Sequence, residues 1–338
     1  MVVERESAAH GASGTAAGIL SPPSPALAKQ PGGQLSARGI ALHRELAEEL
    51  GGAERWDYRP LESAVVARNK DEVRELERTY GKDAVGQVQS AWADKNAMAA
   101  VPLEGAAQLD PGKFTQAMLE EACANGAEVM IGDVQGIRTE QGSVTGVQVS
   151  AGTVETGRVV VAMGPWASES EGWLRTPVPV TPLKGQILHL EIPYAPDAAF
   201  STLDGNYAVR KPSGVVYAGT TEEDTGFDRS WTEEALDGIL GWARTDEHAV
   251  PEGEARGADR LPAAAEPGRA AAAGPGAGVR RRVPGDGPRP EGHRAGALDG
   301  AGDGGAHRHR RMQRDGPGTI RPGAVRGAVA AVSNSEGT

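Results

Sequence analysis

The chain opens with Val2–Glu4 (VVE), a short apolar run closed by an acid, followed by the small-residue stretch Gly11–Gly18 (GASGTAAG). A buried strand ending in a carboxylate is typical of the second strand of a dinucleotide-binding fold, where the acid accepts hydrogen bonds from an adenosine ribose. Small residues let a backbone approach a ligand closely. A preceding G-x-G-x-x-G turn would lie before Met1, so the segments that follow must decide the interpretation.

Helical and strand patterns alternate over the next 230 or so residues. Helical spacing of apolar residues predicts a helix over Gln34–Leu50, and a second follows the cap Asp110-Pro111. The apolar run Val159–Met163 predicts a parallel strand covered on both faces. Alternation predicts a half-buried strand over Gln186–Ile192 and a hairpin over Asn206–Thr220. The sequence therefore predicts a mixed α/β fold, with a Rossmann-like domain interleaved with a mixed, antiparallel-sheet domain.

The last part of the chain has a different composition. No aromatic residue follows Trp242 and no lysine follows Lys211, and Pro251–Thr338 consists mainly of Gly, Ala, Pro and Arg. Such a segment buries too little apolar surface to offset its chain entropy, so we expect a disordered tail without a core.

Composition excludes several classes of function. The net charge of −11 argues against a nucleic-acid surface, and the one basic cluster lies in the tail. No apolar run reaches the roughly 18 residues of a membrane span, and the start lacks the apolar core of a signal peptide. A single cysteine, Cys123, fits a cytoplasmic location, and its apolar neighbours predict that it is buried. His307 and His309 lack partners for a metal site, so no metal is expected.

Six segments together resemble one family, the D-amino-acid oxidase-like FAD-dependent oxidoreductases, which includes glycine oxidase, sarcosine oxidases and D-amino-acid dehydrogenases. The resemblance covers nearly all of residues 2–250, and the segments occur in the family's order. They are VVERE, GASGTAAGIL, LDPGKFTQAMLEEACANGAEV, VVVAMGPWA, TPLKGQILHL and NYAVRKPSGVVYAGTTEEDTGFD.

The resemblance implies a non-covalently bound FAD and a role for each matching residue. The implied contacts are Glu4 and Arg5 at the adenosine ribose, Ser13, Ala17 and Gly18 at the pyrophosphate and flavin edge, Val134 at adenine, Ala162, Gly164 and Trp166 at the strand-end turn beside the pyrophosphate, and Tyr207 and Arg210 toward the substrate. Without the resemblance, the same residues also fit a solvated strand end, a plain turn and an exposed strand face. No catalytic side chain is assigned.

The resemblance also implies interleaved domains: a Rossmann-like FAD-binding domain that lacks its first strand, and a substrate domain with a mixed antiparallel sheet. They are an FAD-binding part over 1–45 and 109–168, a substrate part over 46–108 and 169–250, and the tail over 251–338. The implied reaction moves a hydride from the amine-bearing carbon of glycine, sarcosine or a D-amino acid to the flavin, which oxygen or a quinone then reoxidises. An oligomer is compatible with this interpretation.

Segments that would complete the site precede Met1 or fall in the tail, so we expect weak or no flavin binding and impaired activity. Two alternatives remain: a non-catalytic remnant without a cofactor, or an NAD-dependent enzyme that uses Glu4 on the ribose. A flavin spectrum discriminates among them.

We predict that the tail is a displaced reading frame of a GC-rich gene. Synonymous codons for Pro267–Gly278, read one base later, can give RDGLPLLGPVPG, and those for Arg280–Ala295 can give GVVYLATGHARKGIVL. Both resemble the family's closing segments, which places the change of frame at about residues 248–258. Sequencing the gene tests this, since codons unable to encode these peptides one base later contradict it. A natural disordered tail is the alternative.

Overall fold

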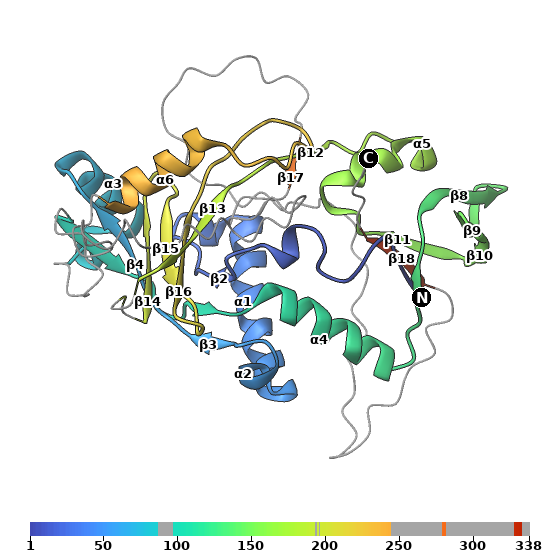
Figure 1. Cartoon of the computed structure of the whole chain (residues 1–338), viewed down its shortest axis with the longest axis horizontal. Coiled ribbons are helices and arrows are strands. Elements are labelled where there is room, and N and C mark those ends of the chain that lie inside the picture. Colours follow the sequence, from blue (N-terminus) through green and yellow to red (C-terminus); the bar gives the residue numbers. More distant parts are fainter. Residues whose placement is uncertain (87–96, 193–194, 196, 245–278, 282–327, 333–338) are drawn as a thin grey trace. The chain divides into compact units, whose positions relative to one another are not determined.

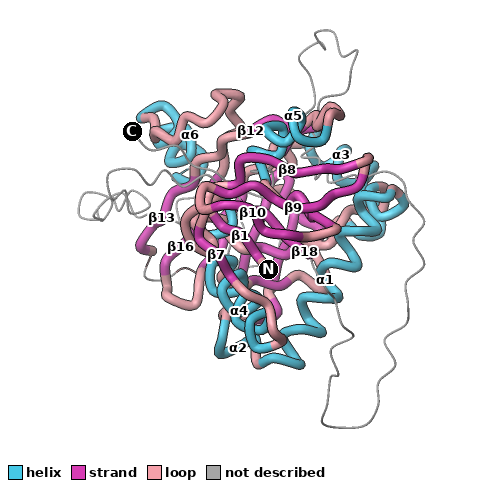
Figure 2. The backbone as a smooth tube through the Cα atoms, turned by 90° about the vertical axis from the view of Figure 1, so that its right-hand side faces the viewer, coloured by secondary structure: helices cyan, strands magenta, loops and turns pink. Residues whose placement is uncertain are grey.

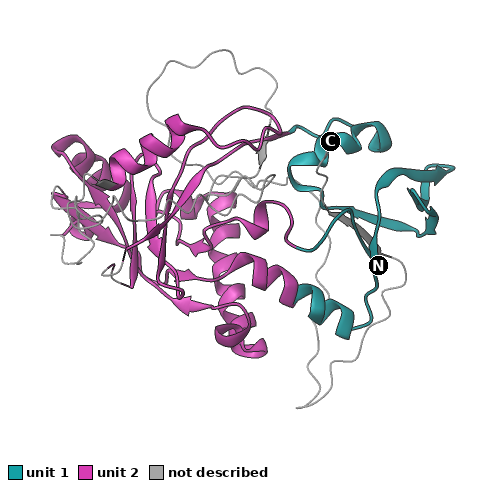
Figure 3. Ribbon diagram, viewed as in Figure 1, with its two compact units in different colours: residues 1–8, 118–180, 300–338 teal, residues 9–117, 181–299 magenta. Residues whose placement is uncertain are grey.

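The computed structural model describes residues 1–86, 97–192, 195, 197–244, 279–281 and 328–332 (Figure 1). The chain forms two compact units, and it passes from one to the other several times (Figure 3). Unit 1 comprises 1–8, 118–180 and 300–338, and unit 2 comprises 9–117 and 181–299. The chain passes between the units near residues 8, 117 and 180. The domain boundaries predicted from the sequence lie near residues 45, 108 and 168.

The helices are short to medium in length. They are α1 (Pro31–Leu50), α2 (Gly52–Arg55), α3 (Lys70–Tyr80), α4 (Pro111–Ala124), α5 (Glu171–Leu174) and α6 (Glu233–Arg244). The strands are β1 (Val2–Glu4), β2 (Ile19–Leu20), β3 (Arg59–Pro60), β4 (Glu62–Ala67), β5 (Ala99–Pro102), β6 (Ala107–Gln108), β7 (Val129–Ile131), β8 (Val134–Glu140), β9 (Ser143–Val149), β10 (Gly152–Glu155), β11 (Arg158–Val161), β12 (Val180–Pro182), β13 (Ile187–Glu191), β14 (Ala198–Thr202), β15 (Tyr207–Arg210), β16 (Val215–Gly219), β17 (Val279–Arg281) and β18 (Ala328–Val332).

Unit 1 is built on a four-stranded sheet in the order β11-β18-β1-β7. All its neighbouring strands are parallel. Dinucleotide-binding sheets have the spatial strand order 3-2-1-4. If β1 takes the second position, as its acidic end indicates, β7 takes the third, β18 the first and β11 the fourth. The meander β8–β10 lies over one face of this sheet, where Val3 packs with Val147 and Val149 (Figure 2).

The opposite face of the unit 1 sheet corrects one prediction. Val159–Met163 was expected to be covered on both faces, but Val160 is 57 % exposed. Val160 and Val129 share a row across the sheet through Ala330 and Val2. Val129 is exposed as well, and so is Ile131 two residues further along β7. The apolar pattern of β11 therefore does not mean burial on both faces: Val159 and Val161 are half-buried, and Val160 between them is exposed.

Unit 2 contains a six-stranded sheet, β13-β16-β15-β14-β4-β5, and a small sheet, β2-β6-β3. Helix α6 covers one face of the large sheet, where Leu188 and Ala218 pack against Ile239. The other face carries Tyr207 and Val209, which cluster with Ala17 from the loop before β2. The predicted hairpin is confirmed as β15 and β16, paired in antiparallel register.

The helix ends follow local rules. Gly51 ends α1 in the left-handed conformation, with φ of 72°, and the Asn69 side chain caps α3 by accepting from the N–H groups of Asp71 and Glu72. The Asp110 carboxylate accepts from Lys113 N at the start of α4. Cys123 on α4 was expected to be buried, but it is exposed. The small residues around it left the choice of face undecided, and Ala117 is the residue of α4 that is buried.

Most of the predicted disordered tail lies outside the described residues. Two short pieces of it are strands: β17 pairs with β12, and β18 lies between β1 and β11. Within the described part of the chain, no helix is long and apolar enough to cross a membrane. The same residues contain no cluster of three or more His, Cys, Asp or Glu able to hold a metal ion.

We expect Leu76→Ala to destabilise unit 2. Leu76 on α3 is 0 % exposed and packs against Val65 and Val101, so its truncation leaves a cavity costing about 2–5 kcal/mol of unfolding free energy. The matched control is Leu35→Ala on α1, where the leucine is 62 % exposed and the expected change is within about 0.5 kcal/mol. Urea unfolding measures both. Equal losses would contradict the packing described here.

Candidate functional site

In unit 1, the carboxyl ends of the parallel strands bring Glu4 and Ala162 to one edge. Val3 and Val161 are both in register with Ala331 of β18. Glu4 follows Val3 at the end of β1, and Ala162 follows the last residue of β11. With β18 between the two strands, Glu4 and Ala162 lie two strand spacings apart, about 10 Å. Ligands of open α/β sheets bind outside this edge.

The Glu4 side chain is fixed where β1 ends. The residue is only 5 % exposed, and its Oε1 accepts a hydrogen bond from Glu6 N at 3.1 Å. Its backbone oxygen accepts from Gly132 N at 2.8 Å, which joins the ends of β1 and β7. A carboxylate has several acceptor sites, so it can also accept hydrogen bonds from the hydroxyl groups of a ligand.

Two further predicted residues lie beside Glu4. Arg5 forms an ion pair with Asp133, with 3.7 Å between Nε and Oδ1. Val134 begins β8 directly after Asp133 and packs in the cluster around Val3. The structure therefore brings Glu4, Arg5 and Val134 together at one end of the sheet.

The turn after β11 holds the other unit 1 residues. Gly164 has φ of +54° and begins a 3-10 helix, Gly164–Ser170, that contains Trp166. Trp166 N donates to Met163 O at 3.1 Å, which closes the turn immediately after Ala162. The strand-end turn predicted from the sequence is therefore present.

In unit 2, the loop before β2 passes very close to the start of α4. Gly18 has φ of +72°, and a Cβ there would lie 2.1 Å from the Leu109 oxygen, so only glycine fits. Leu109 N donates to Gly18 O at 3.0 Å. Ala17 is buried against Tyr207, whereas Ser13 is exposed in the short 3-10 helix Ala12–Gly14.

A buried lysine holds this loop. Lys211 is 6 % exposed, and its Nζ donates to Ala17 O at 2.8 Å and to Leu109 O at 2.9 Å. Burial lowers the pKa of Lys211 to about 8, partly offset by the negative charge of Asp110. Its Nζ also lies 5.6 Å from the centre of the Tyr217 ring.

One face of the large sheet carries a row of polar aromatic side chains. The rings of His189 and Tyr217 stack with their centres 3.8 Å apart. Tyr207 lies on the same face, and its buried hydroxyl has no hydrogen-bond partner among the described residues. Gly219 leaves room for it, because a Cβ there would lie 3.0 Å from the Tyr207 oxygen. Burial raises the pKa of Tyr207, so its hydroxyl remains a donor.

The structure does not bring Arg210 together with Tyr207. Tyr207 is opposite Gly219, while Arg210 is opposite Val216, which packs with Ala208 on the other face of the sheet. Residues three apart in a strand point to opposite faces. The two predicted substrate residues therefore cannot act from the same face of β15.

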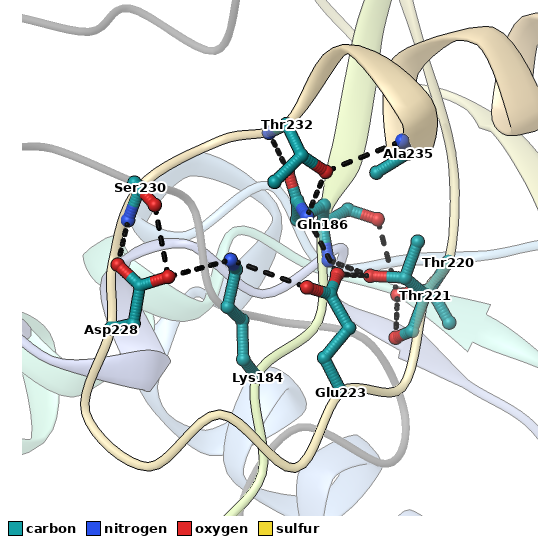
Figure 4. A network of polar contacts seen from close by, with 9 residues as sticks. All are labelled: Lys184, Gln186, Thr220, Thr221, Glu223, Asp228, Ser230, Thr232 and Ala235. Carbon is teal, nitrogen blue, oxygen red and sulfur yellow. Dashed lines mark hydrogen bonds and ion pairs between the residues drawn. The ribbon is translucent and has the colours of Figure 1, made fainter.

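A polar network joins two of the segments singled out in the sequence (Figure 4). Buried Lys184 forms ion pairs with Glu223 at 3.2 Å and Asp228 at 3.4 Å. Gln186 Nε2 donates to Glu223 Oε1 at 2.6 Å, and its Oε1 accepts from Thr232 N at 2.9 Å at the start of α6. Burial raises the pKa of Glu223, but hydrogen bonds from Thr221, Gln186 and Lys184 outweigh this and hold it below its usual value.

The sequence analysis missed the roles of Lys211 and Lys184. Both stand inside recognised segments, VRKPSG and TPLKGQ, but their partners lie far away in the chain. The one indication in the sequence was the position of each lysine beside apolar or small residues, where a buried lysine must have partners.

Comparison with known families assigns the chain. The family model described as FAD dependent oxidoreductase (DAO) matches residues 1–259. The chain belongs to this family. The match ends close to residue 250, where the composition of this FAD-dependent oxidoreductase changes.

Relatives and solved structures support the family and the fold. The hydrogen cyanide synthase subunit HcnC of Pseudomonas aeruginosa is 30 % identical over 220 residues, 59 % of this chain and 51 % of the relative. Glycine oxidase of Pseudomonas putida is 30 % identical over 106 residues, 31 % of this chain and 29 % of the relative. The chain thus spans about half, or less, of the length of these relatives. The structure of glycine oxidase from Geobacillus kaustophilus matches with a TM-score of 0.65 and 24 % identity, covering 76 % of this chain and 72 % of that one.

The residues of unit 1, taken by themselves, fit part of an FAD site. Glu4 offers a buried acceptor at the carboxyl edge of a parallel sheet. In unit 2, considered separately, the backbone of Ala17 and Gly18 carries no bulky side chains. The position of the first strand in the dinucleotide-binding order is held by β18. Glu4, Arg5, Val134 and the turn after β11 are thus the unit 1 residues available to hold the cofactor.

We predict that His189 makes the protein sensitive to acid. Burial, together with the charge of Lys211, lowers the pKa of His189 to about 4 from the usual 6.5. The unfolded chain therefore binds a proton first, and stability is lost as pH falls from about 6.5 to about 4. Allowing for partial solvent access, the loss is about 2 kcal/mol. His189→Phe keeps the stack on Tyr217 and should lose less stability over this range in urea unfolding; parallel curves would contradict the assignment.

Proposed function

We propose that this chain is an FAD-dependent oxidoreductase that oxidises the amine-bearing carbon of a small amino acid: glycine, sarcosine or a D-amino acid. The observation that supports this most is the buried carboxylate of Glu4 in register with the Ala162 turn, at the edge where a dinucleotide-binding sheet holds its cofactor. The glycine oxidase relatives and neighbours are compatible with a small amino-acid substrate.

When bound, FAD would supply the hydride acceptor for oxidation of the amine carbon, and the imine produced would hydrolyse to an oxo acid and ammonia, or methylamine in the case of sarcosine. In unit 1, the Glu4 carboxylate would accept hydrogen bonds from the adenosine ribose. In unit 2, Ala17 and Gly18 would line the flavin edge with backbone groups.

Tyr207 is the candidate that would orient the substrate. Its hydroxyl is buried, protonated and without a partner in the described residues, and it lies in the cluster that contains Ala17. A hydroxyl in this state can donate a hydrogen bond to a substrate carboxylate. Arg210 lies on the opposite face of β15, so we do not carry it forward as a partner of Tyr207.

We expect Glu4→Gln to weaken FAD binding by about 10- to 100-fold. The reason is that a hydrogen bond to a charged acceptor contributes about 1.5–3 kcal/mol. Quenching of tryptophan and flavin fluorescence in a titration measures the affinity. The control is Glu140→Gln, an exposed carboxylate on β8 of the same unit, for which no change is expected. Equal affinities of wild type and Glu4→Gln would remove Glu4 from the site.

The reaction itself is tested on the FAD-loaded protein without oxygen. Glycine, sarcosine and D-alanine are added in turn, and bleaching of the visible flavin band identifies the substrate class. Readmitted oxygen or an added quinone then identifies the electron acceptor by the rate at which the band returns.

A non-catalytic remnant is the second candidate, and a specific observation favours it. The apolar side chains of Val129, Ile131 and Val160 are exposed on one face of the unit 1 sheet. Parallel sheets are normally buried on both faces. A protein that binds an apolar dye, aggregates and fails to bind FAD would support the remnant over the enzyme.

A further inference from the structure

The hydrogen bonding around Gly18, whose φ is +72°, departs from a regular ladder, and Lys211 occupies one of the acceptors. The neighbouring pair Ile19 and Gln108 is antiparallel, and Leu109 N donates to Gly18 O at 3.0 Å. In a hydrogen-bonded antiparallel pair the two residues exchange both bonds, so Gly18 N would donate back to Leu109 O. Here the Leu109 oxygen accepts from Lys211 Nζ at 2.9 Å instead.

The same lysine also donates to the adjoining Ala17–Gly18 peptide. Ala17 O accepts from Lys211 Nζ at 2.8 Å, and the Ala17–Gly18 peptide is trans. In a trans peptide the C=O and N–H bonds point in opposite directions. The Gly18 N–H therefore points away from Lys211, and it has no hydrogen-bond partner in the part of the chain that the structure describes.

We propose that Lys211 is a positioning residue for the cofactor loop: it holds the Ala17–Gly18 peptide so that the Gly18 N–H is presented as a hydrogen-bond donor to the bound flavin dinucleotide. This inference rests on the proposed function, because the donor has a purpose only if that cofactor binds.

The surroundings of Lys211 fit a tether better than an ion pair. No carboxylate lies within ion-pair distance of Nζ among the described residues, and both acceptors are neutral carbonyl oxygens. Burial lowers the pKa of Lys211 to about 8. An amine without its third proton still has two donors, which is the number that the two carbonyls require.

Neighbouring contacts hold the lysine backbone in place. Arg210 O accepts from Gln108 Nε2 at 3.1 Å and from Arg59 Nη2 at 3.2 Å. Lys211 N itself donates to Val215 O at 2.8 Å across the hairpin. The side chain therefore starts from a fixed point and reaches Ala17 from a rigid element, as precise positioning requires.

The test compares FAD affinity and amide hydrogen exchange in the full-length protein and three variants. Lys211→Met removes the donors but keeps the length of the side chain, and Lys211→Gln retains two N–H donors. The matched control is Lys113→Met, which removes an exposed lysine of α4 that pairs with Asp57 instead. Circular dichroism verifies that each variant is folded.

We expect Lys211→Met to weaken FAD binding about tenfold, as the loss of a preorganised hydrogen bond predicts, and Lys211→Gln to restore most of it. FAD should slow exchange in the peptide covering 15–20 in wild type and in Lys113→Met, but not in Lys211→Met. A general loss of stability would instead speed exchange throughout unit 2 and would not be rescued by glutamine.

The outcomes separate this inference from the proposed function. If wild type binds FAD, and Lys211→Met matches it in affinity and in FAD-induced protection, the positioning role is overturned and the function stands. If wild type does not bind FAD, the proposed function fails and the donor role falls with it. Unchanged exchange of 15–20 between ligand-free wild type and Lys211→Met overturns the tether itself.

Discussion

The end of β15 is the joint on which unit 2 depends. There the carbonyl of Arg210 accepts from Gln108 and Arg59, and the Lys211 side chain reaches Ala17 and Leu109. These bonds connect the large sheet to the small sheet β2-β6-β3. Because Gln108 and Lys211 are buried, losing one of their bonds would leave a polar group without water or partner, at about 1–3 kcal/mol. The joint therefore fixes the Ala17–Gly18 loop against the face that carries Tyr207.

The arrangement of unit 1 depends on a different constraint: strand β1 forms parallel pairs along both of its edges. β1 is flanked by β7 and β18, and β18 also pairs with β11. The strand order places the acid of β1 and the turn after β11 at one edge whatever sequence stands between them. Register, rather than any side chain of β18, thus creates the arrangement on which nucleotide binding would rely.

Local patterns carried the correct predictions, and non-local contacts caused the errors. The turn residues of the β15–β16 hairpin and the cap at Asp110 are readable from a few neighbouring residues, and both are present. The exposure of Val160 and Cys123 depends on what packs over them, which no local pattern contains. The distant partners of Lys211 were unreadable for the same reason. By contrast, the spacing of three within one predicted strand already places Tyr207 and Arg210 on opposite faces, and their shared role came from the resemblance alone.

The choice of lysine at position 211 is informative because a buried amine is costly. Desolvation disfavours its charged form, which is why its pKa falls to about 8. An apolar residue would avoid that cost but would leave the Ala17 and Leu109 carbonyls without donors. A regular ladder would satisfy Leu109 O with the Gly18 N–H, yet it would use up that donor. Lysine from the neighbouring sheet satisfies both carbonyls and leaves the Gly18 N–H available, so this solution favours a loop that must bind something over one that must only fold.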